Sequence, residues 1–233
     1  MKILKYLGIG VLVMLSACGS KPKGESAQTE YDKTLSDSIA AIQQEIDSCD
    51  SQAAVLRDQV GEWLRDFSTV ANPREAGSYV ILSSFRNRYP LTSTGLVARI
   101  NDSGQFELIG ALSGGSFNQV TVDAPSESAT SDVVPRDQAL NYHTASLTTV
   151  LFTGEKADAI GRLIADNQLN PLTVTFMESK PVKSWKIPES NARMIAYTYQ
   201  LYSSQKELNR LERRVPMLHE KINLLRIHKD KNK

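Results

Sequence analysis

The 233-residue chain is long enough for one or two domains, and its 41% hydrophobic and 23% charged residues exclude a disordered, collagen-like or polytopic membrane protein. Its 27 Lys and Arg against 26 Asp and Glu leave a net charge of +1, which excludes the broadly basic surface of a nucleic-acid-binding protein. The two cysteines, Cys18 and Cys49, are too few for a disulfide-rich scaffold or a Cys-based zinc site.

The beginning of the chain has the features of a signal peptide. Two lysines precede an apolar run that is shorter than the roughly 20 residues of a membrane-spanning helix. Small residues follow, and this pattern predicts a signal peptide over residues 1–17. The sequence Leu15-Ser16-Ala17-Cys18 resembles the lipobox of bacterial lipoproteins. The resemblance implies cleavage before Cys18 and attachment of acyl chains such as palmitate to that residue.

The residues after the lipobox are expected to connect the anchor to the folded protein. Residues 18–28 are polar and contain Gly, Pro, Ser and Lys, which predicts a flexible tether. Several acyl chains on Cys18 would give stable membrane anchoring. An Asp after the lipidated cysteine often signals retention in the inner membrane in such lipoproteins. Gly19 therefore implies, by the same resemblance, the outer membrane and a protein that faces the periplasm.

A long helix is predicted over residues 29–71. Apolar residues recur at steps of three and four over more than four heptads, which is typical of a helix that packs along one seam. Asn72-Pro73 is expected to end this helix. The seam consists of Leu35, Ile39, Ile42, Ile46, Cys49, Ala53, Leu56, Val60, Trp63 and Phe67.

A second long helix is predicted over residues 188–229. Its seam has the same spacing and nearly the same length as the first. Pro216 lies within it and is expected to kink or end the helix, because proline lacks the backbone N–H and clashes with the preceding turn. The seam consists of Met194, Tyr197, Leu201, Ser204, Leu208, Leu211, Val215, Leu218, Ile222 and Leu225.

The two predicted helices carry opposite charge. Residues 31–67 contain eight acidic and three basic residues, whereas residues 189–229 contain four acidic and eight basic residues. Pairing of the helices with each other aligns opposite charges, whereas self-pairing opposes like charges. We therefore expect an antiparallel helical hairpin, with Phe67 opposite Met194 and Asp47 near Arg213 or Arg214.

The segment between the helices is predicted to be an inserted α+β domain over residues 74–187, with about six strands and one helix. Short alternating or β-rich runs dominate it, and residues 101–104 (Asn-Asp-Ser-Gly) predict a tight turn. Apolar residues on one face predict a helix over residues 154–167. The predicted strands are Tyr79–Ser83, Gly95–Asn101, Gln105–Leu112, Phe117–Asp123, Ala145–Thr153 and Leu172–Met177.

The middle segment offers a candidate binding surface and little chemistry. Arg86, Arg88 and Tyr89 follow a predicted strand, and exposed arginine and aromatic side chains are typical anchors for carbohydrate, anion or protein ligands. Trp185 marks a second such patch. The alternative is that Phe85 and Tyr89 belong to the core and the two arginines are solvated. No catalytic, cofactor-binding or metal-ligating residue is assigned, and no cofactor is expected.

The sequence therefore predicts a non-enzymatic, lipid-anchored protein of the cell envelope. Its helical hairpin would position an α+β domain that binds a small ligand or an unknown envelope protein, and no nucleic acid. One alternative is a coiled-coil scaffold that recruits another envelope protein or forms a homo-oligomer. Another is a membrane-tethered hydrolase that uses His143.

Overall fold

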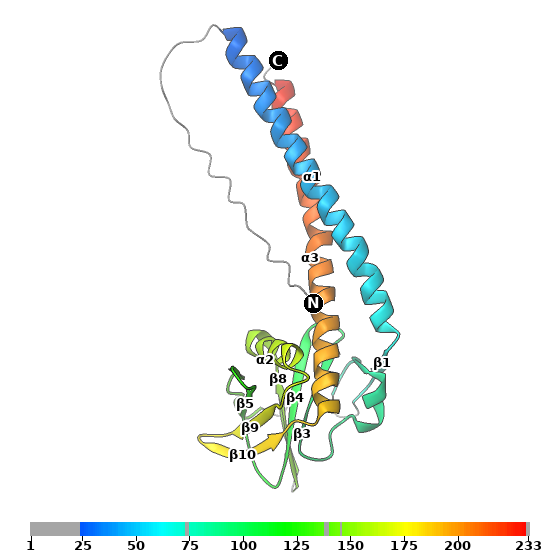
Figure 1. Cartoon of the computed structure of the whole chain (residues 1–233), viewed down its shortest axis with the longest axis vertical. Coiled ribbons are helices and arrows are strands. Elements are labelled where there is room, and N and C mark those ends of the chain that lie inside the picture. Colours follow the sequence, from blue (N-terminus) through cyan, green and yellow to red (C-terminus); the bar gives the residue numbers. More distant parts are fainter. Residues whose placement is uncertain (1–23, 73–74, 138–139, 145, 232–233) are drawn as a thin grey trace.

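The fold combines two long helices with two antiparallel β-sheets, as a computed structural model shows (Figure 1). The structure describes residues 24–72, 75–137, 140–144 and 146–231, with side chains from residue 30 to residue 230. The predicted signal peptide, the lipobox and Cys18 lie outside these residues. Among the described helices, none has a stretch long and apolar enough to cross a membrane.

The first helix, α1, is displaced relative to the prediction and spans Gly24–Leu64. It begins inside the segment expected to be a flexible tether. It also ends well before residue 71, because Phe67–Val70 forms strand β1, which pairs with Tyr79–Leu82 of β2. The prediction that Phe67 belongs to the helical seam is therefore wrong, and Phe67 is a strand residue that pairs with Leu82. The aromatic and β-branched residues of β1 favour a strand once a partner strand is available.

The last helix, α3, spans Glu189–Lys231 and continues through Pro216. Of the two effects predicted for Pro216, a kink or an end of the helix, the end is wrong, since the α-helix continues to Lys231. A proline inside a helix removes one hydrogen bond, and packing on both sides offsets this loss. Leu211 and Leu218, which flank Pro216, are each 2% exposed.

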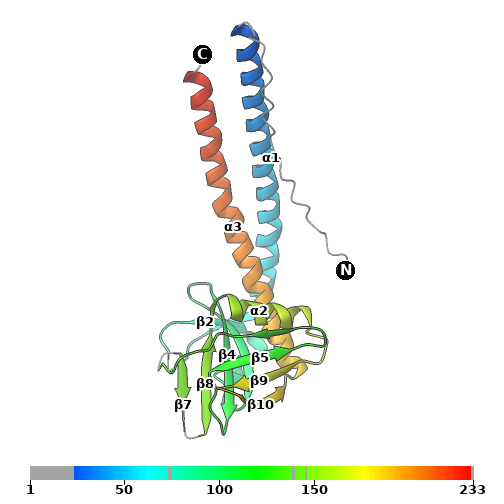
Figure 2. The same cartoon turned by 90° about the vertical axis from the view of Figure 1, so that its left-hand side faces the viewer.

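The helices α1 and α3 lie side by side and extend away from the sheets (Figures 1 and 2). Their shared core contains Ile42, Ile46, Cys49, Ala53, Leu211, Leu218 and Ile222. Polar and ring contacts join Tyr31 to His228, Ser36 to Lys229, Glu45 to Arg214 and Arg57 to Glu212. Arg214 pairs with Glu45 at 2.8 Å, two residues before Asp47, and the expected proximity of Asp47 to Arg213 or Arg214 stays a prediction.

A six-stranded antiparallel sheet forms the centre of the α+β part, with strand order β1-β2-β3-β4-β8-β7. The turn predicted at residues 101–104 joins β3 to β4 and is confirmed. Gly104 adopts a φ of +74° there and donates a 2.9 Å hydrogen bond to the carbonyl of Asn101. The remaining strands of this sheet are β3 (Gly95–Asn101), β4 (Phe106–Ser113), β7 (Asn141–His143) and β8 (Leu147–Phe152).

A second antiparallel sheet and the helix α2 (Gly154–Asp166) pack on one face of the six-stranded sheet. Phe106 contacts Tyr199 of α3 with ring centroids 5.5 Å apart, and Phe117 lies between Phe152 and Phe176. The second sheet has the order β10-β9-β5-β6. Its strands are β5 (Gln119–Asp123), β6 (Ser128–Thr130), β9 (Thr173–Met177) and β10 (Pro181–Lys186).

All six predicted strands and the predicted helix are present, within a few residues at their ends. Among the described residues the structure adds four short or edge strands, β1, β6, β7 and β10, and a 3-10 helix η1 over Ser83–Arg88. The α+β part is also larger than the predicted insert of residues 74–187. It includes β1 and the start of α3, where Met194 and Ile195 are fully buried.

Candidate functional site

Successive side chains of a strand point to opposite faces of the six-stranded sheet. Leu96, Ala98 and Ile100 of β3 belong to the core that α2 and α3 cover. Arg99 therefore points to the opposite face. Its direct cross-strand neighbour on β4 is Glu107. A charged pair inside two otherwise apolar strands is costly to bury unless all its polar groups are bonded.

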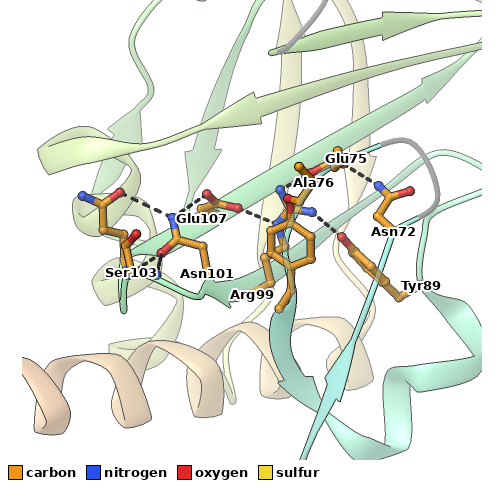
Figure 3. A network of polar contacts seen from close by, with 10 residues as sticks. Asn72, Glu75, Ala76, Tyr89, Arg99, Asn101, Ser103 and Glu107 are labelled. Carbon is orange, nitrogen blue, oxygen red and sulfur yellow. Dashed lines mark hydrogen bonds and ion pairs between the residues drawn. The ribbon is translucent and has the colours of Figure 1, made fainter.

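The guanidinium of Arg99, which is 1% exposed, has three acceptors (Figure 3). Its Nε donates to Glu107 Oε2 at 2.5 Å, while Nη1 donates to the hydroxyl of Tyr89 and Nη2 to Glu75 Oε2. Glu107 Oε1 also accepts a 2.8 Å hydrogen bond from the side-chain amide of Asn101. The segment that contains Glu75 and the segment that follows η1 are thus both bonded to one strand residue.

The ring of Tyr79 lies against the same guanidinium, with the Arg99 Cζ 3.5 Å from the ring centroid. Burial raises the pKa of Tyr79 to about 12, with Arg99 opposing the shift and Glu75 and Glu107 adding to it. The Tyr79 hydroxyl therefore stays neutral and donates to the carbonyl of Ala76 at 2.9 Å. Burial also raises the pKa of Tyr89 against the opposing charge of Arg99.

The charge of Arg99 is fixed by its partners. Burial alone would lower the pKa of Arg99, but the hydrogen bond to Glu75 and the charge of Glu107 outweigh it and raise this pKa. The guanidinium therefore remains protonated, and the cluster holds one positive group between two carboxylates.

These residues form one wall of a cavity of about 360 Å³. This volume is within the range of small-molecule sites, which combine apolar walls with a few placed polar groups. Among the described residues, the apolar part of the lining consists of Ala76, Pro90, Leu91, Ile109, Leu140 and Leu151. The polar and aromatic part consists of Asn72, Glu75, Tyr79, Tyr89, Arg99, Glu107, Asn141, Tyr142 and Thr149.

Two asparagines of the lining, Asn72 and Asn141, are held by hydrogen bonds. Asn72 donates its side-chain amide to Glu75 Oε1, which ties the loop after β1 to the Arg99 cluster. On the other side, the side chain of Asn141 accepts from the backbone of Asp137 at 2.6 Å and donates to the carbonyl of Pro135 at 3.1 Å. Both asparagines are 7% exposed, so these bonds hold the rim in place.

The structure does not bring all four residues of the predicted binding surface to this cavity. Tyr89 lines it, but it is half-buried and its hydroxyl is bonded to Arg99. Arg86 and Arg88 lie on η1 and are exposed, with the Arg88 guanidinium 5.2 Å from the centroid of the buried Phe85 ring. Trp185 lies half-buried on β10 of the other sheet.

Sequence reasoning missed Arg99, Glu107 and Glu75. A signal for the first two exists, because each is a charged residue inside an otherwise apolar strand next to a well-defined turn. The hairpin register places such residues opposite each other. Glu75 carries no such signal, because it lies in a loop whose path is set by tertiary contacts.

His143 has a neighbour that does not suit nucleophilic catalysis. Its Nδ1 lies 3.0 Å from the hydroxyl of Thr148, which itself donates to the carbonyl of Gly115 at 2.7 Å. The hydroxyl proton thus points away from the imidazole, whereas a nucleophile must donate it to the base. Thr148 is also only 4% exposed.

The described residues contain no group of three or more His, Cys, Asp or Glu side chains that could hold a metal ion. In comparisons with known proteins, no family model, no curated protein and no solved structure matches the chain. The site is therefore interpreted from its own geometry.

Proposed function

We propose that this protein is a lipid-anchored envelope protein that binds a small organic ligand in the cavity beside Arg99. The observation that carries the proposal is the cavity itself, whose lining combines apolar side chains with the hydrogen-bonded charged cluster of Arg99, Glu107 and Glu75. A purely structural Arg–Glu pair needs no open volume next to it, whereas a binding site does.

The two long helices have a spacing role in this proposal. α1 and α3 form an antiparallel helical hairpin, held by the apolar core around Ile46 and Leu218 and by exposed ion pairs that select the partner. The beginning of α1 follows the proposed anchor at Cys18. The hairpin therefore holds the α+β part away from the outer membrane, in the periplasm.

The ligand proposal is tested with a library of small soluble compounds, measured by saturation-transfer NMR on the purified protein. Leu151 lines the cavity, and Leu151→Trp fills part of its volume. We expect compounds that bind the wild type to lose their signal in this variant. The matched control is Leu169→Trp at a loop position that is 85% exposed, which should keep the signal. Binding that survives Leu151→Trp in a folded protein would refute the cavity as the site.

The anchor proposal has its own test. Palmitate labelling in cells should mark the wild type and fail with Cys18→Ala. The control is Cys49→Ala, at the cysteine buried between the helices, which should keep the label. Label on the Cys18→Ala protein would refute the lipobox interpretation.

A scaffold function is the second candidate, because α3 carries an apolar stripe. Met217 and Leu224 are each 61% exposed and Ile227 is 53% exposed, and helical spacing places them on the side away from α1. Basic residues flank this stripe, and the outer face of α1 is acidic, so a second copy of the chain is the partner that fits. Light scattering should give a dimer that Leu224→Gln weakens, and a monomer at all concentrations would refute this function.

A further inference from the structure

The charges that line the cavity do not balance. Among the described residues, the lining contains two carboxylates, Glu75 and Glu107, and one guanidinium, Arg99. These described groups leave one excess negative charge. The hydroxyl groups of Tyr79 and Tyr89 add no charge, because burial raises the pKa of both phenols.

The three groups are also not equally accessible. The side chains of Arg99 and Glu107 are 1% and 8% exposed, whereas that of Glu75 is 31% exposed. Each of the three nitrogens of Arg99 already donates to a protein acceptor. Of these three side chains, that of Glu75 is therefore the most accessible to a molecule that enters the cavity.

These two facts disfavour an anionic ligand. A carboxylate or phosphate would compete with Glu75, Glu107 and the Tyr89 hydroxyl for a guanidinium that is only 1% exposed, and it would add a second excess negative charge beside the described lining residues. A protonated amine instead gains the attraction of Glu75 without breaking a bond of Arg99. Tyr142 adds an aromatic ring to the lining, and aromatic faces attract organic cations.

The rest of the lining requires an apolar body on the ligand. Leu91, Ile109, Leu140 and Leu151 supply the larger apolar side chains of the lining. Burial of apolar area supplies most of the affinity in such sites, while the polar group fixes orientation.

We infer that the cavity takes a small organic cation, with a protonated amino group placed at Glu75 and an apolar body placed on the leucine and isoleucine wall. This inference rests on the proposed ligand-binding function and names its ligand class. It makes Glu75 the residue that determines specificity, while Arg99 positions Glu75.

The test compares three probes that share one phenethyl body. Phenethylamine is a cation, phenethyl alcohol is neutral and hydrocinnamate is an anion at neutral pH. Dissociation constants come from NMR titration of the purified wild-type chain. We expect phenethylamine to bind about tenfold more tightly than phenethyl alcohol, and hydrocinnamate to bind most weakly.

Variants identify the carboxylate responsible. Glu75→Gln keeps an acceptor for Arg99 but removes the charge, so the preference for the amine over the alcohol should fall to less than about threefold. Glu75→Asp keeps the charge and should keep the preference. The matched control is Glu45→Gln, which removes a carboxylate that pairs with Arg214 far along the helices and should leave all three constants unchanged.

The outcomes separate the inference from the function on which it rests. If none of the probes binds the wild type, the proposed ligand-binding function fails. If the alcohol or the anion binds at least as well as the amine, the cation inference is overturned while the ligand site stands. An amine preference that Glu75→Gln leaves intact, in a variant with a native spectrum, also overturns it. If Glu75→Gln does not fold, the order of the three dissociation constants for the wild type and for Glu75→Asp decides whether the cation inference stands.

Discussion

Replacement of Arg99 by methionine should destabilise the protein strongly. The side chain is 1% exposed and donates to Glu107, Glu75 and the hydroxyl of Tyr89. Methionine has a similar length and fills the volume without the charge. The variant therefore leaves two carboxylates and one hydroxyl without their shared donor.

The magnitude follows from the burial of each partner. Breaking a buried ion pair by removing one member typically costs about 3–5 kcal/mol. Glu107 remains buried at 8% exposure, but Glu75 is 31% exposed and can turn towards water. We therefore expect a cost near the lower end, about 3 kcal/mol, which lowers Tm by about 6–12 °C for a protein of this size.

The assay is urea unfolding and thermal unfolding followed by circular dichroism. The matched control is Arg57→Met, which removes an exposed arginine that pairs with Glu212 at 2.7 Å and should cost less than about 1 kcal/mol. The double variant Arg99→Met/Glu107→Leu should recover part of the lost stability, because no carboxylate then stays buried on β4. If Arg99→Met and Arg57→Met lower the free energy of unfolding by the same amount, the claim that the Arg99 cluster is buried is refuted.

Three further predictions concern packing and pH. Gly161→Ala should destabilise by about 1–3 kcal/mol, because its Cβ would lie 2.6 Å from the Tyr199 ring, whereas Gly61→Ala, with no atom within 4 Å, should stabilise by up to about 1 kcal/mol. Ile46→Ala, at a position 2% exposed between α1 and α3, should cost about 2–5 kcal/mol in urea unfolding. Tyr79→Phe should make stability less dependent on pH in alkaline solution. The pKa of Tyr79 rises from 10.0 to about 12 on folding, so the folded state holds the proton longer and wild-type stability falls as pH rises through this range.

Each of these predictions has an outcome that contradicts it. Equal stability changes for the two glycine variants would mean that α2 does not approach α3 as closely as observed. Val55 is 66% exposed. If Ile46→Ala lowers the free energy of unfolding no more than Val55→Ala does, Ile46 is not buried between α1 and α3. If the stability of the Tyr79→Phe protein falls between pH 10 and pH 12 as much as that of the wild type, the pKa of Tyr79 does not rise on folding.

The regular elements of the fold follow from local sequence patterns. The heptad spacing predicts both long helices, and alternation with turn residues predicts β3, β4 and the turn between them. The end of α1 could not be predicted in this way, because the seam continues in register to Phe67. Pairing of β1 with β2 decides this end, and that contact joins segments on either side of a loop.

The candidate site was less accessible to sequence reasoning than the fold. The binding surface predicted on Arg86, Arg88, Tyr89 and Trp185 rests on residue type. The alternative allows Tyr89 to turn inward, but residue type does not reveal that its partner there is Arg99. The importance of Arg99 depends on which face of the sheet is covered by helices. That assignment needs the topology of six strands and the loop that carries Glu75.

The central claim is that the cavity beside Arg99 is a ligand site, and methyl NMR tests it most directly. Titration of methyl-labelled protein with phenethylamine should shift the methyl signals of Leu91, Ile109, Leu140 and Leu151, which line the cavity. Signals from the core between α1 and α3 should stay in place. Shifts confined to the helices, or no shifts at concentrations that saturate a weak site, would contradict the account.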